Sequence, residues 1–205
     1  MLNELISSIL QLLVFAAIPF VVYLIREKKA TGFLDWCGLK SSPQKANMMA
    51  LLVILLLTGP IILLNQLSPE FREIMLDPKS VTGKIRLMGA GWETIVTIFL
   101  VALIKTALAE ELFFRGFVAK RLIALWGLQT GNIVQAIIFG AIHTLLFAFV
   151  TPNLFFLVVI FIFPAVGSYF MVVINEKMAG GSIIPGWIAH GLANIFSYLF
   201  FGFFA

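Results

Sequence analysis

The sequence predicts an all-α protein: a polytopic bundle of about six transmembrane helices that forms one integral membrane domain over residues 1–205. Composition supports this class, because 61% of the residues are hydrophobic, 12% are charged and the mean hydropathy is +1.06. A soluble domain is about 25% charged. Apolar runs of the ~20 residues that a bilayer crossing requires recur along the chain. These runs are continuous instead of alternating, which excludes a transmembrane β-barrel.

Six apolar segments are expected to span the membrane. They are Leu5–Ile25, Met48–Leu67, Trp92–Trp126, Asn132–Val150, Leu154–Ile174 and Ile183–Phe204. Gly59 and Pro60 should kink the second segment or end it early. The third segment has 35 residues. At ~1.5 Å per residue it exceeds the bilayer core, so it should break near Gly116 or project into the aqueous phase. The polar stretch 68–90 should contain a loop and an amphipathic piece at the interface.

The first segment is predicted to be an uncleaved helix, because its basic cluster follows the apolar run and no signal cleavage site is evident. Lysine and arginine in short loops indicate orientation. The connection 26–47 carries five of them and, if all six segments span, shares its side with Lys120, Arg121 and Lys177. Eight basic residues against four place this side in the cytoplasm of a multi-pass protein in a prokaryotic plasma membrane. Cys37 would be a native probe of that orientation.

Charged side chains inside predicted spans are candidate functional residues, since a charge at mid-membrane is costly. In the third span, Glu111 and Arg115 stand four residues apart, share a helix face and can form an ion pair. Glu110 lies ~100° around the helix from Glu111. The residue four positions after Glu110 is Phe114, which carries no charge. One acid therefore remains without a charged partner in an apolar setting, as suits a general base or acid.

Both histidines of the chain also fall within predicted spans. His143 lies centrally in the fourth span, four residues after Phe139, and His190 lies in the sixth span on the same face as Asn194. Small residues beside them should let the helices approach closely. These small residues are Gly140, Ala141, Gly191 and Ala193. Glutamate, two histidines and an asparagine form a set that can activate water and stabilise an oxyanion.

Each of these residues also has a purely structural explanation. The pair of Glu111 and Arg115 alone is more often structural than catalytic, and a lone intramembrane histidine can hydrogen-bond a neighbouring helix. Asn194 alone is more often a bridge between helices. Outside the set, Glu93 should be a first-turn acid favoured by the helix dipole, and Lys105 should snorkel or form an ion pair. The combination favours function, because the glutamates and the two histidines occupy three separate spans.

Three short motifs follow one another on these spans. They are Glu-Glu-x-x-x-Arg at 110, 111 and 115, Phe-x-x-x-His at 139 and 143, and His-x-x-x-Asn at 190 and 194. In this order and spacing they resemble the CPBP (Abi) intramembrane peptidases, which include type II CAAX prenyl endopeptidases and bacteriocin-processing enzymes. The resemblance covers roughly residues 105–200, within a motif-bearing core of about 92–204. The chain matches every motif position but has fewer predicted spans than larger members.

The resemblance implies hydrolysis of a peptide bond in a membrane-associated peptide or protein, such as a prenylated CAAX-type substrate or a bacteriocin or leader peptide. Glu110 would activate the attacking water with the help of His143. His190 and Asn194 would stabilise the oxyanion of the tetrahedral intermediate. Glu111 and Arg115 would position the first pair, Glu110 and His143, and Phe139 is a further site-positioning residue.

Metal dependence stays open at this point, because the family is often labelled as metallopeptidase. Glu110, His143 and His190 could be three zinc ligands with one open position. The single cysteine, Cys37, excludes a cysteine-cluster metal site and an intrachain disulfide. No His-Glu-x-x-His pattern is present. The expectation is a metal-free, glutamate-driven reaction that needs no cofactor.

Two other function classes fit the composition. A non-catalytic membrane protein, such as a bacteriocin self-immunity factor or a partner-binding scaffold, would keep the same residues for stability. A proton-coupled transporter could use Glu110 and the histidines as a relay, but six spans without an internal repeat favour alternating access only weakly. The expected partners are the lipid bilayer and a peptide or protein substrate. Nucleic acid is excluded, because the basic residues behind the net charge of +4 lie between apolar runs.

Overall fold

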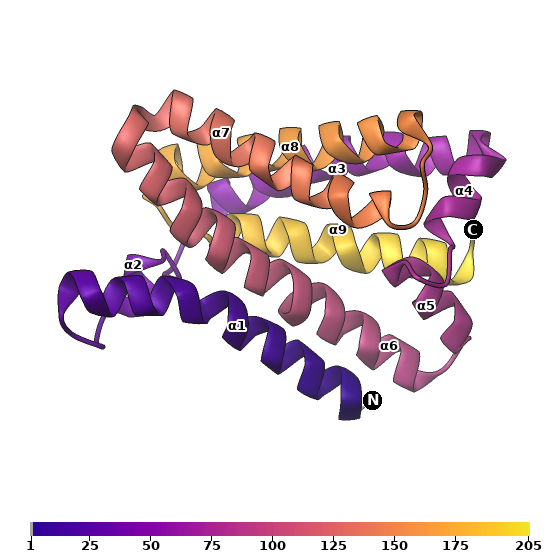
Figure 1. Ribbon diagram of the computed structural model, residues 1–205, viewed down its shortest axis with the longest axis horizontal. Coiled ribbons are helices and arrows are strands. Elements are labelled where there is room, and N and C mark those ends of the chain that lie inside the picture. The colour runs from indigo at the N-terminus through magenta and orange to yellow at the C-terminus, as the bar shows by residue number, and fades with distance from the viewer. Residues whose placement is uncertain (1) are drawn as a thin grey trace.

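The computed structural model describes residues 2–205, and every regular element in this range is a helix (Figure 1). The elements are α1 (Leu2–Glu27), α2 (Phe33–Trp36), α3 (Gln44–Leu67), α4 (Pro69–Met75), α5 (Val81–Met88), α6 (Trp92–Phe99), η1 (Leu100–Leu108), η2 (Glu111–Ala119), α7 (Lys120–Ala148), α8 (Leu154–Lys177) and α9 (Ile184–Phe203). The predicted all-α class is confirmed. The long helices form a bundle in which α9 runs between α3 and the segment from α6 to η2.

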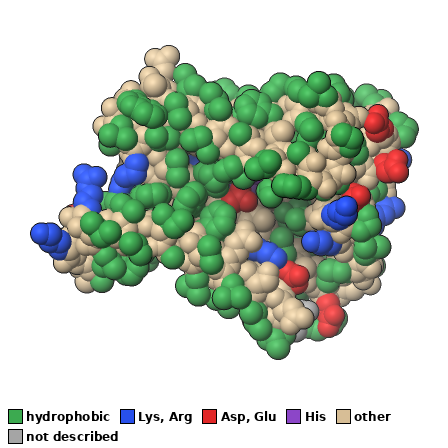
Figure 2. Space-filling view, viewed as in Figure 1, with side chains coloured by type: hydrophobic (Ala, Val, Ile, Leu, Met, Phe, Trp, Pro, Cys, Tyr) green, Lys and Arg blue, Asp and Glu red, His purple; other side chains and the backbone are tan. Residues whose placement is uncertain are grey.

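Within residues 2–205, three helices are long and apolar enough to cross a membrane, namely α1, α3 and α8. They correspond to the first, second and fifth predicted segments. Figure 2 shows hydrophobic side chains over the middle of the visible face, while most charged side chains gather at its two ends. This distribution suits a bilayer around the middle of the bundle. The total of six spans stays a prediction.

One long helical run extends from Trp92 to a reversal at Gly127. The run comprises α6, η1, η2 and the first residues of α7. At Gly127 the backbone has φ 77° and ψ 167°, outside the helical region, and glycine adopts this positive φ without a Cβ clash. A break near Gly116, one of the two outcomes expected for this segment, does not occur, because η2 continues through this residue to Ala119. Gly116 instead allows a close contact, because a Cβ there would lie 2.6 Å from the carbonyl oxygen of Cys37.

Wide helical turns in η1 and η2 were not predicted. Both segments are π-helical, with hydrogen bonds between residues five apart instead of four. Carbonyls of η1 also accept side-chain hydrogen bonds from other helices: Gln11 Nε2 donates to the Lys105 carbonyl at 2.9 Å, and Trp187 Nε1 donates to the Leu103 carbonyl at 2.8 Å. Such segments are frequent at functional sites, and Glu110 lies at the junction between the two.

The prolines inside the long helices do not end them. α3 continues through Pro60 to Leu67, so the early end that was one of two expected outcomes does not occur. α8 contains Pro164 and runs to Lys177, three residues beyond the predicted end at Ile174. A proline removes one backbone donor, and in an apolar segment neighbouring helices and side chains can compensate for it.

The polar stretch 68–90 contains two short helices, α4 and α5. The hydroxyl of Ser68 accepts a hydrogen bond from the Phe71 N–H at 3.2 Å and thereby caps α4. The hydroxyl of Ser80 accepts from the Gly83 N–H at 2.9 Å and caps α5. Serine is among the preferred N-cap residues because its oxygen satisfies an orphan donor of the first turn.

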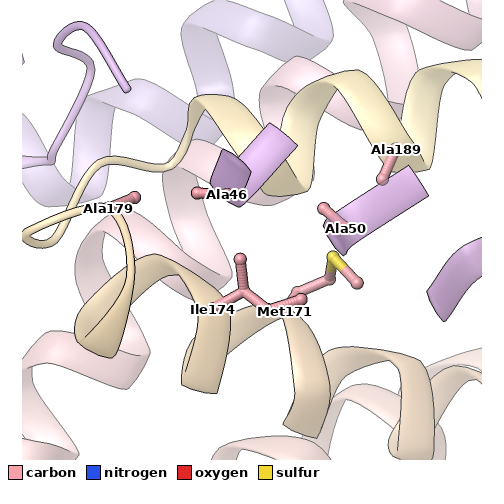
Figure 3. Packing of buried hydrophobic residues seen from close by; sticks show 6 residues of the cluster. All are labelled: Ala46, Ala50, Met171, Ile174, Ala179 and Ala189. Carbon is pink, nitrogen blue, oxygen red and sulfur yellow. The ribbon is translucent and has the colours of Figure 1, made fainter. Parts of the chain in front are cut away.

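Small side chains bring α3, α8 and α9 together near one end of the bundle. Ala46 and Ala50 of α3 and Ala189 of α9 form one buried cluster with Met171 and Ile174 of α8 (Figure 3). Helices that meet through alanine can approach closely. This end of the bundle contains the first turns of α9, the helix that bears His190.

The basic connections gather at this end, as predicted. Lys120 Nζ donates to Glu176 Oε1 at 2.9 Å and to the Gly181 carbonyl at 2.8 Å. The Ile183 N–H donates to the Gly38 carbonyl at 2.8 Å. The segment around Gly38 therefore covers the start of α9, and we call it the cap (residues 28–43). Its assignment to the cytoplasm stays a prediction.

Cys37 lies inside the cap and cannot report the orientation of the protein, contrary to expectation. Its exposed fraction is 0%, and burial raises the pKa of its thiol to about 12. The thiolate is the reactive form, so Cys37 should resist alkylation at neutral pH. A cysteine at Leu34, which is 53% exposed, should react with an impermeant maleimide only after cells are permeabilised. The unsubstituted protein gives the background, and labelling of Leu34→Cys on intact cells would invert the orientation.

Candidate active site

Glu110 stands between the two histidines. Its Oε2 lies 3.9 Å from Nε2 of His143 on α7 and 3.9 Å from Nε2 of His190 on α9. The side chain of Glu110 is 17% exposed, and its buried Oε2 has no hydrogen-bond partner among residues 2–205. Three helical segments therefore bring their polar groups together, as the sequence predicts.

Both imidazoles are held at Nδ1, which leaves both Nε2 atoms facing Glu110. Nδ1 of His143 lies 2.9 Å from the carbonyl oxygen of Phe139, one turn earlier. Nδ1 of His190 lies 3.2 Å from Oε1 of Glu111. A carbonyl and a carboxylate only accept, so each Nδ1 carries a proton. The two rings differ in what lies behind them: a neutral carbonyl for His143 and a carboxylate for His190.

The predicted ion pair between Glu111 and Arg115 is present and buried. Arg115 Nε lies 3.3 Å from Oε1 of Glu111, and the side chains are 4% and 0% exposed. The Nε–H is not aligned for a hydrogen bond, so the contact is chiefly electrostatic. The resemblance implied that this pair positions Glu110 and His143, but Glu111 contacts His190 instead.

Phe139 connects Arg115 to the other histidine. The guanidinium carbon of Arg115 lies 4.0 Å above the Phe139 ring centre, within the range of a cation–π interaction. The Phe139 and His143 ring centroids are 4.4 Å apart. Arg115 therefore supports His143 through Phe139, while Glu111 supports His190 directly.

Asn194 contacts η1 through Thr106, a residue that sequence reasoning missed. Asn194 Nδ2 donates to Thr106 Oγ1 at 2.8 Å, and Thr106 Oγ1 donates to the Val101 carbonyl at 2.8 Å. Thr106 precedes Glu110 by four residues and shares its helix face, so this spacing could have identified it. Asn194 keeps a second N–H for another acceptor.

A cavity of about 200 Å³ adjoins these residues. Its polar wall contains Glu111, Arg115, His143, His190 and Asn194, and its apolar wall contains Ile54, Leu57 and Ile61 of α3 with Phe163 and Met171 of α8. Apolar cavities with a few convergent polar groups are typical ligand sites. Glu110 does not line this cavity. Figure 2 shows an acidic side chain between hydrophobic side chains near the middle of the visible face.

The possible zinc site has suitable ligand types, since two imidazole nitrogens and a carboxylate are ligands that zinc accepts. In the described part of the chain, however, no group of three or more His, Cys, Asp or Glu side chains is arranged to hold a metal ion. Glu110, His143 and His190 thus do not form a metal site in the arrangement that the structure shows.

Gly186 of α9 is the place where Glu111 touches the last helix. A Cβ at this position would lie 2.4 Å from Glu111 Oε2, so Gly186→Ala should displace the buried carboxylate. Overpacking costs ~1–3 kcal/mol, and the thermal midpoint in detergent should fall. Gly191→Ala is the matched control, because its Cβ would meet the flexible end of the Leu103 side chain at 2.6 Å. Equal midpoints for the two variants would contradict this placement.

Gly140 confirms one of the predicted close approaches. A Cβ there would lie 2.6 Å from the carbonyl oxygen of Phe161 on α8, so only glycine lets the two helices meet at this depth. At Gly191 the nearest atom is instead the flexible end of the Leu103 side chain of η1, which can move. The close approach at Gly140 fixes how α7 presents His143 to Glu110.

Comparison with known proteins assigns a family to this arrangement. The sequence profile of the family described as type II CAAX prenyl endopeptidase Rce1-like matches residues 92–196, which are 105 of the 205 residues. The match includes every motif residue from Glu110 to Asn194. No curated protein and no solved structure shows a match to the chain. With helices able to span a membrane and a matching profile over half its length, the chain belongs to the Rce1-like type II CAAX prenyl endopeptidase family of membrane proteases.

Proposed function

We propose that the protein is an intramembrane endopeptidase with six spans, in which Glu110 activates water for attack on a peptide bond. The observation that carries this proposal is the position of the Glu110 carboxylate between two imidazoles with different groups behind them. Glu110 Oε2 is 3.9 Å from the Nε2 atom of each ring. A water could therefore lie within about 2.8 Å of Glu110 Oε2 and of either Nε2 atom. Such a water has the polar partners that a buried water needs.

Glu110 and His143 form the side of the site that binds water. With its proton on Nδ1, neutral His143 offers Nε2 as an acceptor, and Glu110 offers a carboxylate oxygen. Each accepts one hydrogen of the same water, whose oxygen then attacks the carbonyl carbon of the substrate. Glu110 takes the proton, a C–O bond forms, and the carbonyl electrons move onto the oxygen.

His190 and Asn194 form the side that binds the oxyanion. The carboxylate of Glu111 behind Nδ1 stabilises positive charge on the His190 ring, so Nε2 can carry a second proton and donate it in a hydrogen bond. The second N–H of Asn194 is the other donor. When the C–N bond breaks, Glu110 returns its proton to the leaving amine. A carboxylic acid and an amine result, and Glu110 is again a carboxylate.

The proposed substrate is a membrane-associated peptide, either a prenylated CAAX-type peptide or a bacteriocin or leader peptide. Purified protein in lipid nanodiscs should cleave a fluorogenic peptide that carries an isoprenylated cysteine, with both products identified by mass spectrometry. The same peptide without the lipid and an unprenylated leader peptide distinguish the substrate classes. Absence of cleavage of all three by well-folded protein would count against a peptidase.

Turnover should persist after exhaustive chelation, because the proposed base is Glu110 itself. Metal analysis of the dialysed protein should find zinc well below one equivalent while the rate stays unchanged. A zinc peptidase treated in parallel shows that chelation was effective. Loss of activity with recovery on adding zinc would overturn the metal-free mechanism and make His143 and His190 candidate ligands.

A further inference from the structure

Asn175 of α8 is a buried polar residue that the proposed mechanism leaves without a role. It lies in the last turn of the helix, one residue beyond the predicted end of the fifth span at Ile174. Its side chain is 2% exposed, and neither Oδ1 nor Nδ2 has a hydrogen-bond partner among the described residues. A buried amide without partners is costly, and native proteins hold few of them. Its presence in an apolar helix therefore requires an explanation.

Gly186 of α9 lies close to both Asn175 and Glu111. The point where a Cβ would stand on Gly186 is 3.3 Å from Asn175 Nδ2 and 2.4 Å from Glu111 Oε2. Glu111 Oε2 is also buried and without a hydrogen-bond partner in residues 2–205. An unused donor and an unused charged acceptor thus flank the same small space.

The packing around Gly186 keeps α8 and α9 in place. Ile174, the residue before Asn175, belongs to the same buried cluster as Ala189 of α9, one turn after Gly186 (Figure 3). The Asn175 carbonyl also accepts a hydrogen bond from the Gly181 N–H at 2.7 Å. The end of α8 is therefore held against the start of α9, with the amide of Asn175 between them.

We propose that Asn175 is a positioning residue for Glu111, whose Oε2 accepts a hydrogen bond from Asn175 Nδ2 directly or through one bridging water. This inference rests on the proposed function, in which Glu111 supports His190. With Oε2 held, Oε1 stays directed at His190 Nδ1 and at Arg115. The Nε2 atom of His190 then stays directed at Glu110.

Asn175→Leu removes the amide donor and keeps a similar side-chain volume, and Asn175→Ser keeps a hydroxyl donor on a shorter side chain. Asn65 of α3 provides a matched control: it is 0% exposed, neither of its side-chain polar atoms has a hydrogen-bond partner within residues 2–205, and it does not line the cavity. Misplacement of a catalytic group near 1 Å costs up to ~100-fold, so kcat of Asn175→Leu should fall about tenfold or more with KM little changed. Asn175→Ser should retain an intermediate kcat, and Asn65→Leu should retain that of the wild type. A loss in Asn175→Leu no larger than in Asn65→Leu would overturn the inference.

A second measurement separates this inference from the peptidase assignment. The chain has two histidines. Each single His→Gln variant therefore removes the imidazole ¹⁵N resonances of one histidine and so assigns them. In Asn175→Leu the His190 resonances should shift while those of His143 stay in place. Unchanged His190 resonances would refute the positioning role even in an active enzyme. A shift in a protein whose wild type cleaves no peptide would support the contact with Glu111 and reject the proposed function.

Discussion

Glu110→Gln should abolish peptidase turnover and leave the thermal midpoint unchanged. Glutamine keeps the volume of the side chain but cannot take the proton of the attacking water. General base catalysis contributes about 10²–10⁴-fold, so kcat should fall by at least two orders of magnitude. Stability should hold, because the nearest imidazole nitrogens lie 3.9 Å from Glu110 Oε2 and this oxygen has no hydrogen-bond partner among residues 2–205. Turnover and thermal unfolding are measured on the same detergent preparation.

Glu93→Gln is the matched control for this variant. Glu93 lies exposed in the first turn of α6, on the helical run that also bears Glu110, and its replacement should change neither quantity. Cleavage by Glu110→Gln at the wild-type rate would exclude Glu110 as the base. If an inert Glu110→Gln protein retained its full function in cells, a scaffold or immunity protein would be the better description.

Glu111→Gln should lower stability and turnover together. The carboxylate is 0% exposed and faces Arg115, which is 4% exposed. Leaving one charge of a buried pair without its partner costs ~3–5 kcal/mol, a large part of the ~5–15 kcal/mol by which soluble domains are stable. His190 loses its carboxylate in the same step, so the rate should fall as well. Thermal unfolding in detergent and turnover provide the two measurements.

The ion pair of Lys105 and Glu4 serves as the control for Glu111→Gln. Its atoms are 3.2 Å apart, but the side chains are 24% and 40% exposed, and exposed pairs contribute only about 0–1 kcal/mol. Glu4→Gln should therefore leave the midpoint nearly unchanged. Inactivity of Glu111→Gln at wild-type stability would mean that Glu111, and not Glu110, does the chemistry.

The convergence of the site could be predicted from the sequence because the polar residues are few and the spans are long. A charged or imidazole side chain in an apolar helix has to face other polar groups. Glu110, His143 and His190 were therefore expected to face one another inside the bundle. Spacing within one helix also predicts the pair of Glu111 and Arg115. It does not predict the contact of Glu111 with His190, because the rotation of α9 depends on packing at Gly186.

The wide turns of η1 could not be predicted for a similar reason. Their carbonyls accept hydrogen bonds from Trp187 and Gln11, which are 84 and 94 residues distant in sequence. Local propensity does not include such partners. A break at Gly116 was one of two expected outcomes, and the sequence could not show that this glycine instead allows a close contact with Cys37 of a remote segment. Residue periodicity thus determines which segments are helices, while tertiary contacts determine how each helix is wound and where it ends.

The hydrogen bond between Gly38 and Ile183 joins segments that are 145 residues apart in the chain. A ribosome that adds ~5–20 residues per second delivers the second segment about 7–29 s after the first. By the end of that interval Glu110 and Glu111 have been synthesised, but His190 and Asn194 have not. The cap has no α9 to cover, and neither carboxylate has an imidazole from the last helix. In a nascent chain the proposed hydrolytic site is therefore incomplete, and it can assemble only after the last helix has been translated.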